Sequence, residues 1–207
     1  QIIKPMGTYI DANPYNDVHQ SRYSKSLGKI IMACTEDDCL ATFDIETYEV
    51  RELVNFVGLA KEQGLEVPEG KLSHFHINSI LLDSSPYDDG KEDLYINFHN
   101  HGIRESQILV YKGLTKESLS EGSLSWKDFS VVAQGGFCTH DIVKISGGLL
   151  TCDSKNGCII EHGQKIPALR KLKINNRNLF DPSVSWTRGL VQMKGFFAVG
   201  LSKVYES

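Results

Sequence analysis

Four side chains that can bind small ligands recur at wide, similar intervals along this sequence: His19, His76, His140 and Arg188. Roughly 50 to 60 residues separate each from the next, which is close to the length of one unit in several repeat architectures. A neutral imidazole can donate or accept a hydrogen bond and can bind a transition metal. A guanidinium offers paired donors that suit a carboxylate or a sulfate. If the fold brings these residues together, they form a polar site.

The set is compatible with two kinds of ligand site. A site for an anion or a sugar would use Arg188 as the fixed donor and the histidines as neutral partners. Its expected residues are His76, Asn78, His140, Asp141 and Arg188. A site for a divalent metal such as zinc, copper or iron would be built from His19, His76 and His140. The positive charge of Arg188 disfavours a metal ion beside it.

The same polar residues can also serve the architecture alone. In that interpretation they hydrogen-bond neighbouring repeat units and line a water-filled channel. His99 and His101 form an HNH motif, which we interpret as a solvated turn because no metal-binding helix accompanies it. The serines lack a G-x-S-x-G elbow, so a serine hydrolase has no support, and no glycine-rich phosphate loop is present.

The elements that would position these residues are clearest between residues 139 and 160. This segment predicts a strand over 140–145, a Gly-Gly turn, a strand over 149–153, an Asn-Gly turn and a third strand from Cys158. Valine, isoleucine and leucine fall at strand spacing, and both turn dipeptides favour two-residue β-hairpins. The segment therefore predicts a three-stranded antiparallel unit led by a histidine.

The same order of strands and turns recurs in units near residues 19–53, 76–133, 140–174 and 188–207. We therefore expect an all-β fold, a single β-propeller domain built from about four to five four-stranded antiparallel blades. An antiparallel sandwich is the alternative, because it also has short strands at even spacing. The segment Val54–Gln63 is the one credible helical turn.

The last unit shows two clear strands, whereas a blade has four. Residues 1–10 would complete it, with Gln1–Met6 as the closing strand, or the natural chain would continue beyond Ser207. An open blade edge would favour self-association, because unpaired strand edges attract further strands. In a propeller the first strands line the central channel, so their leading residues are expected to meet at one mouth.

Apolar residues at strand spacing are expected to be mostly buried between the blades. They are Ile30, Phe43, Leu94, Ile96, Leu109, Ile142, Leu149, Ile159, Leu190, Phe197 and Val199.

The composition excludes several classes of protein. The chain has 207 residues, of which 41% are apolar, and a net charge of −4, so it can bury a core and lacks the basic stripe of a nucleic-acid surface. No apolar run approaches the roughly 20 residues needed to span a bilayer. The five cysteines form no CxxC pair, and we interpret them as buried free thiols of a reducing compartment, which favours the cytoplasm.

Three segments carry a family resemblance: HINSI from His76, THDIVKISGGLL from Thr139 and RGLVQMKGFFAVGLSK from Arg188. They resemble blade starts of a group of bacterial β-propeller proteins of unknown function. The resemblance covers the last three units and implies a propeller without an established activity. Members of that group typically extend past the equivalent of Lys203, so the resemblance implies a longer natural chain. A more distant likeness, of fold alone, is to propeller lyases with axial histidines.

The sequence thus predicts a propeller domain that binds a small polar or anionic ligand, such as a carbohydrate, at its channel mouth. The alternative is a metal-dependent enzyme of lyase or hydrolase type at the same histidine-lined mouth, with a divalent metal as cofactor. A third hypothesis is a scaffold that binds another protein on its blade edges. None of the three involves nucleic acid or a membrane.

Overall fold

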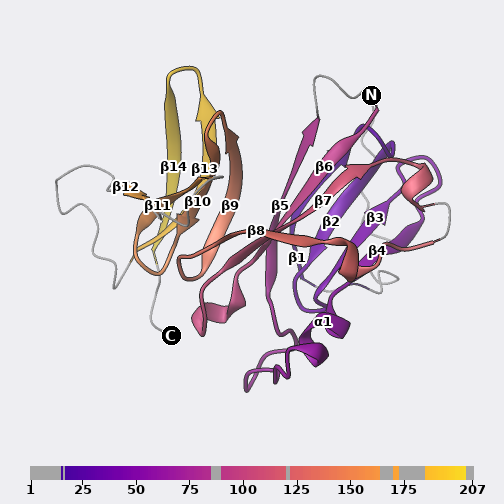
Figure 1. Ribbon diagram of the computed structural model, residues 1–207, viewed down its shortest axis with the longest axis horizontal. Coiled ribbons are helices and arrows are strands. Elements are labelled where there is room, and N and C mark those ends of the chain that lie inside the picture. Colours follow the sequence, from indigo (N-terminus) through magenta and orange to yellow (C-terminus); the bar gives the residue numbers. More distant parts are fainter. Residues whose placement is uncertain are drawn as a thin grey trace.

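The computed structural model describes Tyr15 and residues 17–84, 90–119, 122–163, 170–172 and 185–203 of the chain. These residues form an all-β protein whose sheets are antiparallel and open (Figure 1). The expected fold class is therefore confirmed at the level of all-β structure.

Four sheets follow one another in sequence order. Sheet one contains β1 (Val18–Ser24), β2 (Lys29–Cys34), β3 (Cys39–Phe43) and β4 (Val50–Asn55). Sheet two contains β5 (Ile77–Ser84), β6 (Glu92–Phe98), β7 (Gln107–Leu114) and β8 (Ser130–Gln134). Sheet three contains β9 (Thr139–Ile145), β10 (Gly148–Asp153), β11 (Cys158–Gly163) and β12 (Arg170–Leu172). Sheet four is the hairpin of β13 (Ser185–Met193) and β14 (Phe196–Lys203).

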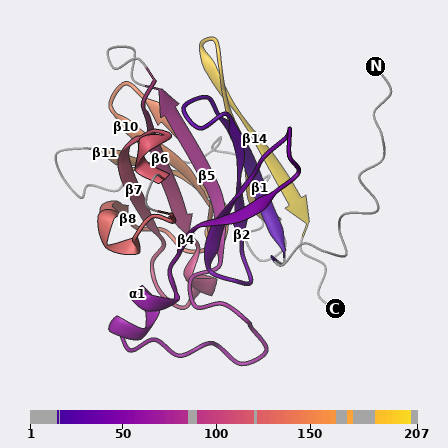
Figure 2. The ribbon, with the colours of Figure 1, turned by 90° about the vertical axis from the view of Figure 1, so that its right-hand side faces the viewer.

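Helical structure is sparse in these residues. The α-helix α1 spans Val57–Glu62 and lies beyond one end of the strands (Figures 1 and 2). The expected helical turn over Val54–Gln63 began too early, because Val54 and Asn55 pair with β3 as the end of β4. The short 3-10 helices are η2 (Asn100–Gly102), η3 (Glu117–Leu119) and η4 (Trp126–Asp128).

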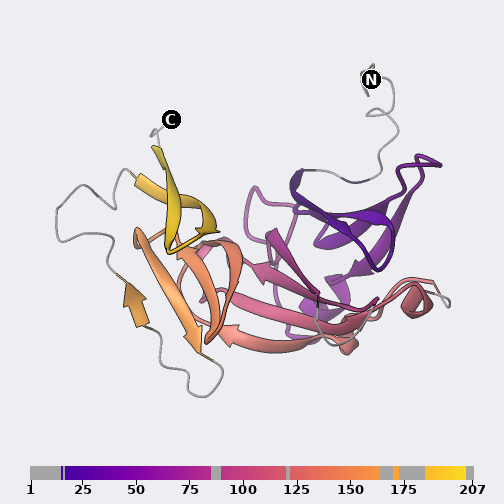
Figure 3. The same ribbon diagram turned by 90° about the horizontal axis from the view of Figure 1, so that it is seen from above.

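The first strand of each sheet contacts the first strand of the next. β1 lies against β5, β5 against β9, and β9 against β13. Seen from above, the four sheets are arranged along an arc in sequence order (Figure 3). The ends of these first strands are thereby brought close together, although they are far apart in the sequence.

One type of hydrogen bond recurs where consecutive sheets meet. The hydroxyl of Thr35 donates to the carbonyl of Ile77 over 2.6 Å, and the hydroxyl of Ser154 donates to the carbonyl of Thr187 over 2.6 Å. Between sheets two and three, the amide of Asn97 donates to the carbonyl of Thr139 over 2.7 Å. Each bond joins the end of a second strand to the start of the next first strand. We call these contacts the seam bonds.

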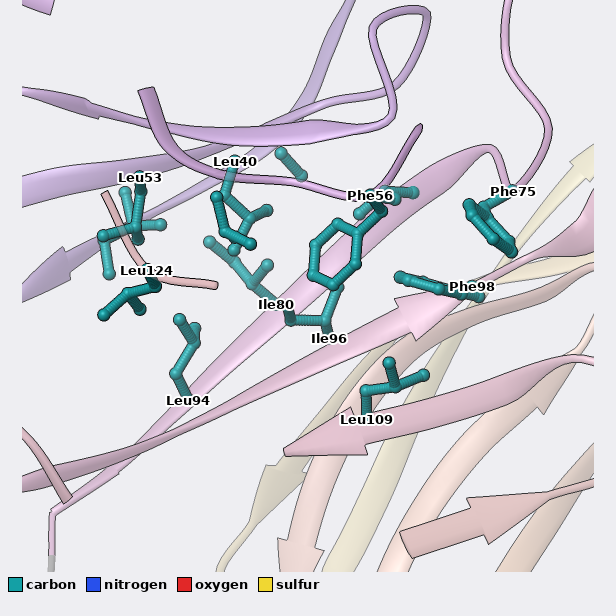
Figure 4. Close-up of a cluster of buried hydrophobic side chains, with 14 of the residues drawn as sticks. Leu40, Leu53, Phe56, Phe75, Ile80, Leu94, Ile96, Phe98, Leu109 and Leu124 are labelled. Carbon is teal, nitrogen blue, oxygen red and sulfur yellow. The ribbon is translucent and has the colours of Figure 1, made fainter. Parts of the chain in front are cut away.

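Apolar side chains fill the space between the sheets. The largest cluster joins sheets one and two, where Phe56 and Phe75 pack against Phe98 with ring centroids 5.0 and 4.4 Å away (Figure 4). Smaller clusters join sheet two to sheet three and sheet three to sheet four. Burial of this apolar surface is the main contribution that holds successive sheets together.

The predicted core is correct for the central strands. The buried members are Leu94, Ile96, Leu109, Ile142, Leu149, Ile159 and Leu190. Ile30, Phe43 and Val199 are half-buried, and Phe197 is 39% exposed, so the expectation was wrong for Phe197. The hairpin of sheet four leaves Phe197 largely uncovered, because the described part of this sheet has two strands instead of four. All five cysteines are buried thiols outside any disulfide bond, as expected.

The expected strand at the start of the chain is not tested. Residues 1–10, the expected closing strand, lie outside the described residues. β12 (Arg170–Leu172) lies near the end of the unit that was expected over residues 140–174. None of the helices among the described residues is long and apolar enough to cross a membrane.

Candidate functional site

Five histidines meet at the starts of β1, β5 and β9 and the end of β6. We call His19, His76, His99, His101 and His140 the histidine cluster. The ring centroids of His19 and His76 are 5.0 Å apart, those of His76 and His99 are 4.6 Å apart, and those of His99 and His140 are 5.0 Å apart. His101 lies 4.9 Å from His76. The imidazoles thus form a continuous row from the exposed His19 inward to the buried His140.

His99 is the central ring of this row and has an unusual environment. It is 5% exposed, and neither of its ring nitrogens has a hydrogen-bond partner among the described residues. Burying an unpaired polar group costs about 1–3 kcal/mol, so such groups are rare in native proteins and need an explanation. An unpaired imidazole surrounded by others is the strongest single indication of a binding site in this molecule.

A buried carboxylate supports the backbone that carries His76. The carboxylate of Asp38 accepts hydrogen bonds from the backbone amides of His74, Phe75 and His76. The bond from His76 N to Asp38 Oδ1 is 3.2 Å long. Burial raises the pKa of Asp38 although these hydrogen bonds oppose the rise. His76 itself has φ 54, a left-handed conformation that is uncommon for a residue with a side chain. The backbone at His76 is therefore held by Asp38, which lies in the turn between β2 and β3 of sheet one.

The tautomer of His140 follows from its hydrogen bonds. Its Nδ1 lies 2.8 Å from the carbonyl oxygen of Cys138, which can only accept, and 2.7 Å from the hydroxyl of Ser154. That hydroxyl donates its own proton to Thr187, so it accepts from His140. The neutral ring therefore carries its proton on Nδ1, and the lone pair is on Nε2.

A hydrogen bond also fixes the tautomer of His101, in this case through Nε2. Its Nε2 lies 2.9 Å from the carbonyl oxygen of Ser73, so the proton is on Nε2 and the lone pair on Nδ1. His101 is half-buried and has φ 51.

Burial keeps several imidazoles of the cluster neutral. Desolvation, followed by repulsion from the neighbouring rings, lowers the pKa of His99 to about 2 and that of His76 to about 3. Desolvation and the charge of Arg188 lower the pKa of His140 to about 4. Desolvation also lowers the pKa of His101. At neutral pH these rings can serve as neutral hydrogen-bonding groups or as metal ligands.

Trp186 contacts both the histidine cluster and Arg188. The indole ring is 6.4 Å from His99 and 6.1 Å from His140, measured between ring centroids. The guanidinium of Arg188 lies 5.2 Å from the centroid of the same ring, and this residue is exposed. The structure thus gathers His76, His140 and Arg188 in one place, connected through His99 and Trp186.

The two remaining predicted ligand residues have structural partners. The amide of Asn78 donates to the carbonyl of Thr139, and its oxygen accepts from Ser79 and Asn97. This buried side chain therefore joins sheets two and three. Asp141 accepts the backbone amide of Gly189 over 2.7 Å and so fixes the segment that follows Arg188.

The prediction that His19, His76, His140 and Arg188 occupy the same position in their strands was wrong for His76. His19, Asn78 and His140 are the second residues of β1, β5 and β9, whereas His76 precedes β5. The seam bonds to Ile77 and Thr187 place Arg188 in the same register as Asn78. The error arose because the repeat was aligned on histidines instead of strand starts.

The solvated-turn interpretation of His99 and His101 was also wrong. His99 directly follows the buried strand β6 and turns inward, and His101 is half-buried against Ser73. The available signal was the position of His99 at the end of an apolar strand. Trp186 was missed as well, and its place two residues before Arg188 was the corresponding signal.

As the side chains stand, the described residues contain no group of three or more histidine, cysteine or acidic side chains placed to hold a metal ion. The trio His19, His76 and His140 is not assembled, because His99 lies between His76 and His140.

Neither a protein-family model nor a curated protein sequence matches this chain.

Proposed function

We propose that the four sheets are successive blades of a β-propeller, and that the mouth formed at the starts of their first strands binds a small polar or anionic ligand. The contacts between consecutive first strands and the recurrence of the seam bonds support the first part. The resemblance to bacterial propeller proteins of unknown function belongs to the same proposal. A further strand, from residues 1–6 or from a second chain, would extend the last blade, of which two strands are described.

The arrangement of Arg188 and Trp186 carries the ligand proposal. The guanidinium is exposed and lies over the indole, so its planar donors can meet a carboxylate or a sulfate from solution. The indole is half-buried, so it offers apolar surface beside these donors. A sugar acid combines a carboxylate with an apolar ring face, and it is the ligand class that fits best.

Binding of matched sugars tests this proposal. We expect D-glucuronate to bind in isothermal titration calorimetry at least about tenfold more tightly than D-glucose, because only the acid has a carboxylate for Arg188. The substitution Arg188→Gln should reduce glucuronate affinity to that of glucose. Arg51→Gln is the matched control, because Arg51 is exposed on β4 and pairs with Glu49 over 2.8 Å.

Two outcomes contradict the proposal. The first is equal affinity for the acid, the neutral sugar and inorganic sulfate, or saturable binding of none of them. The second is an equal loss in Arg51→Gln and Arg188→Gln, which would indicate a general charge effect instead of a site.

A further inference from the structure

Two cysteines face each other across the hairpin of β2 and β3. Cys34 is the last residue of β2 and Cys39 is the first residue of β3, and the two are direct partners in the antiparallel register. Opposed residues point to the same face of a sheet, with Cα atoms about 4.5–5.5 Å apart. A disulfide needs Cα atoms about 4.4–6.8 Å apart, so this pair can be joined without moving the backbone.

The two thiols are in contact on the outer face of sheet one. Interaction with the Cys34 thiol, ahead of burial, raises the pKa of Cys39. Both side chains are fully buried, in a small cluster with Ala41. Leu40, the strand residue between Cys39 and Ala41, belongs instead to the core that joins sheets one and two. The cysteine pair therefore lies on the face of sheet one that is directed away from sheet two.

The cover over this pair includes one side chain that can move independently of the sheet. Tyr15, Met32 and Val50 pack against the cysteines and are half-buried. Met32 and Val50 belong to strands, whereas Tyr15 precedes β1. Movement of the Tyr15 side chain can therefore expose the sulfur atoms to a small molecule while the strand pairing stays intact.

The pair also closes the turn that supports the backbone of the histidine cluster. Residues 35–38 form this turn between β2 and β3. Thr35 donates the seam bond to β5, and Asp38 accepts hydrogen bonds from the backbone amides of residues 74–76. A covalent bond at the base of the turn would restrict its opening and so hold the backbone at His76.

The corresponding turn of sheet three contains a second cysteine pair that does not match. Cys152 faces Ile159 across the ladder. Cys158 faces Asp153. Adjacent residues of a strand point to opposite faces, so Cys152 and Cys158 lie on opposite faces of sheet three. They cannot be joined without rearranging the strands, and they serve as an internal control.

We propose that Cys34 and Cys39 are a redox-sensitive site, which a small disulfide such as oxidised glutathione converts into a reversible disulfide that closes the 35–38 turn. One cysteine thiolate attacks the glutathione disulfide, which forms a mixed disulfide and releases one glutathione. The other cysteine then attacks the protein sulfur of the mixed disulfide and releases the second glutathione. The protein loses two electrons and two thiol protons, and both pass to the glutathione disulfide, which becomes two thiols. Reversible disulfides of this kind act as redox sensors in reducing compartments.

Treatment of the folded protein with oxidised glutathione tests this proposal. The remaining thiols are then labelled with N-ethylmaleimide under denaturing conditions, and tryptic peptides are weighed. The peptide of residues 30–51 should lack the label and be lighter by two hydrogen atoms, whereas Cys152 and Cys158 should be labelled. We expect the oxidised protein to melt about 3 °C or more above the reduced protein. Its amides at residues 74–76 should exchange at least about threefold more slowly, and dithiothreitol should reverse both changes.

Three variants separate this site from other effects of oxidation. Cys39→Ala should abolish the rise in melting temperature and leave a glutathione adduct on Cys34, because no second thiol can displace it. Cys158→Ala is the matched control and should respond to glutathione disulfide as the wild type does. Tyr15→Ala should speed formation of the disulfide at least about threefold, because access limits the reaction of buried thiols. An unchanged rate in Tyr15→Ala would contradict this route of access.

Two results overturn the proposal. The first is wild-type protein in which Cys34 and Cys39 remain fully labelled after treatment, or in which Cys152 and Cys158 become linked in equal yield. The second is a disulfide between Cys34 and Cys39 that leaves amide exchange at residues 74–76 unchanged, which would separate the bond from the histidine cluster.

Discussion

The hydroxyl of Thr35 donates a 2.6 Å hydrogen bond to the carbonyl oxygen of Ile77, the first residue of the next sheet. The bond is buried and joins residues 42 positions apart in sequence. It places the start of β5 directly after sheet one, and His76 precedes that start by one residue. The seam bonds therefore do more than hold sheets together, because they also position the histidine cluster.

Removal of this hydroxyl should destabilise the protein. Thr35→Val keeps the side-chain shape but leaves the buried carbonyl of Ile77 without this donor, which costs about 1–3 kcal/mol in the free energy of unfolding. Urea denaturation measures the loss. Thr47→Val is the control, because Thr47 is exposed in a turn and its replacement should change stability by no more than about 0.5 kcal/mol. Equal losses of stability in the two variants would show that this seam bond does not stabilise the protein.

The carboxylate of Asp38 should be needed for the local structure around His76. Asp38→Asn replaces one accepting oxygen by a donor, so at least one backbone amide between residues 74 and 76 loses its partner. We expect a loss of about 1.5–3 kcal/mol, the usual range for hydrogen bonds to a charged group. Amide hydrogen exchange at residues 74–76 should become faster. The exposed Asp128→Asn is the control, and unchanged exchange in Asp38→Asn would contradict this role.

Truncation of apolar side chains should cost more stability between the well-packed sheets than on the exposed hairpin of sheet four. Leu149 is buried between sheets two and three, so Leu149→Ala should cost about 2–5 kcal/mol. Phe197→Ala on the exposed hairpin of sheet four should cost much less, although the residue is larger. Chemical denaturation of both variants checks the order, and a greater loss for Phe197→Ala would show that another segment covers this hairpin.

Strand positions were predictable from sequence because turn residues and alternating apolar residues are local signals. The strands of the segment around residues 139–160 were placed almost to the residue, whereas the turns differ from the expected ones. Ser146 and Gly147 join β9 to β10, and the four residues 154–157 join β10 to β11. The exposure of Phe197 was not predictable in this way. It depends on which strands cover sheet four, and that is a property of the assembled sheets.

The site was predictable in part. The gathering of His76, His140 and Arg188 followed from their places near strand starts. The inward turn of His99 and the structural role of Asn78 did not, because both depend on hydrogen bonds between sheets. The positive φ of His76 is likewise imposed by Asp38, a residue 38 positions earlier in the chain.

Acid should destabilise the protein through the histidine cluster. His76, His99 and His140 have low pKa values in the folded chain and values near 6.5 when unfolded. The unfolded chain therefore binds more protons below pH 6.5. Their stabilisation is complete above that pH and falls as the pH decreases toward about 4, by up to about 1.4 kcal/mol per pH unit for each histidine. Between pH 5 and 6, His99→Phe should reduce the slope of the free energy of unfolding against pH by about 1.4 kcal/mol per pH unit, the contribution of one histidine. An unchanged slope would exclude His99 from this effect.

The central claim is that neutral imidazoles line the place where the first strands meet, and side-chain NMR tests it most directly. Long-range proton–nitrogen correlations report the protonation and the tautomer of each histidine ring between pH 7.5 and 4.5. We predict that His76 and His99 remain neutral at pH 5, and that His140 is neutral with its proton on Nδ1. Titration of His99 and His140 near pH 6.5, or a proton on Nε2 of neutral His140, would contradict the account.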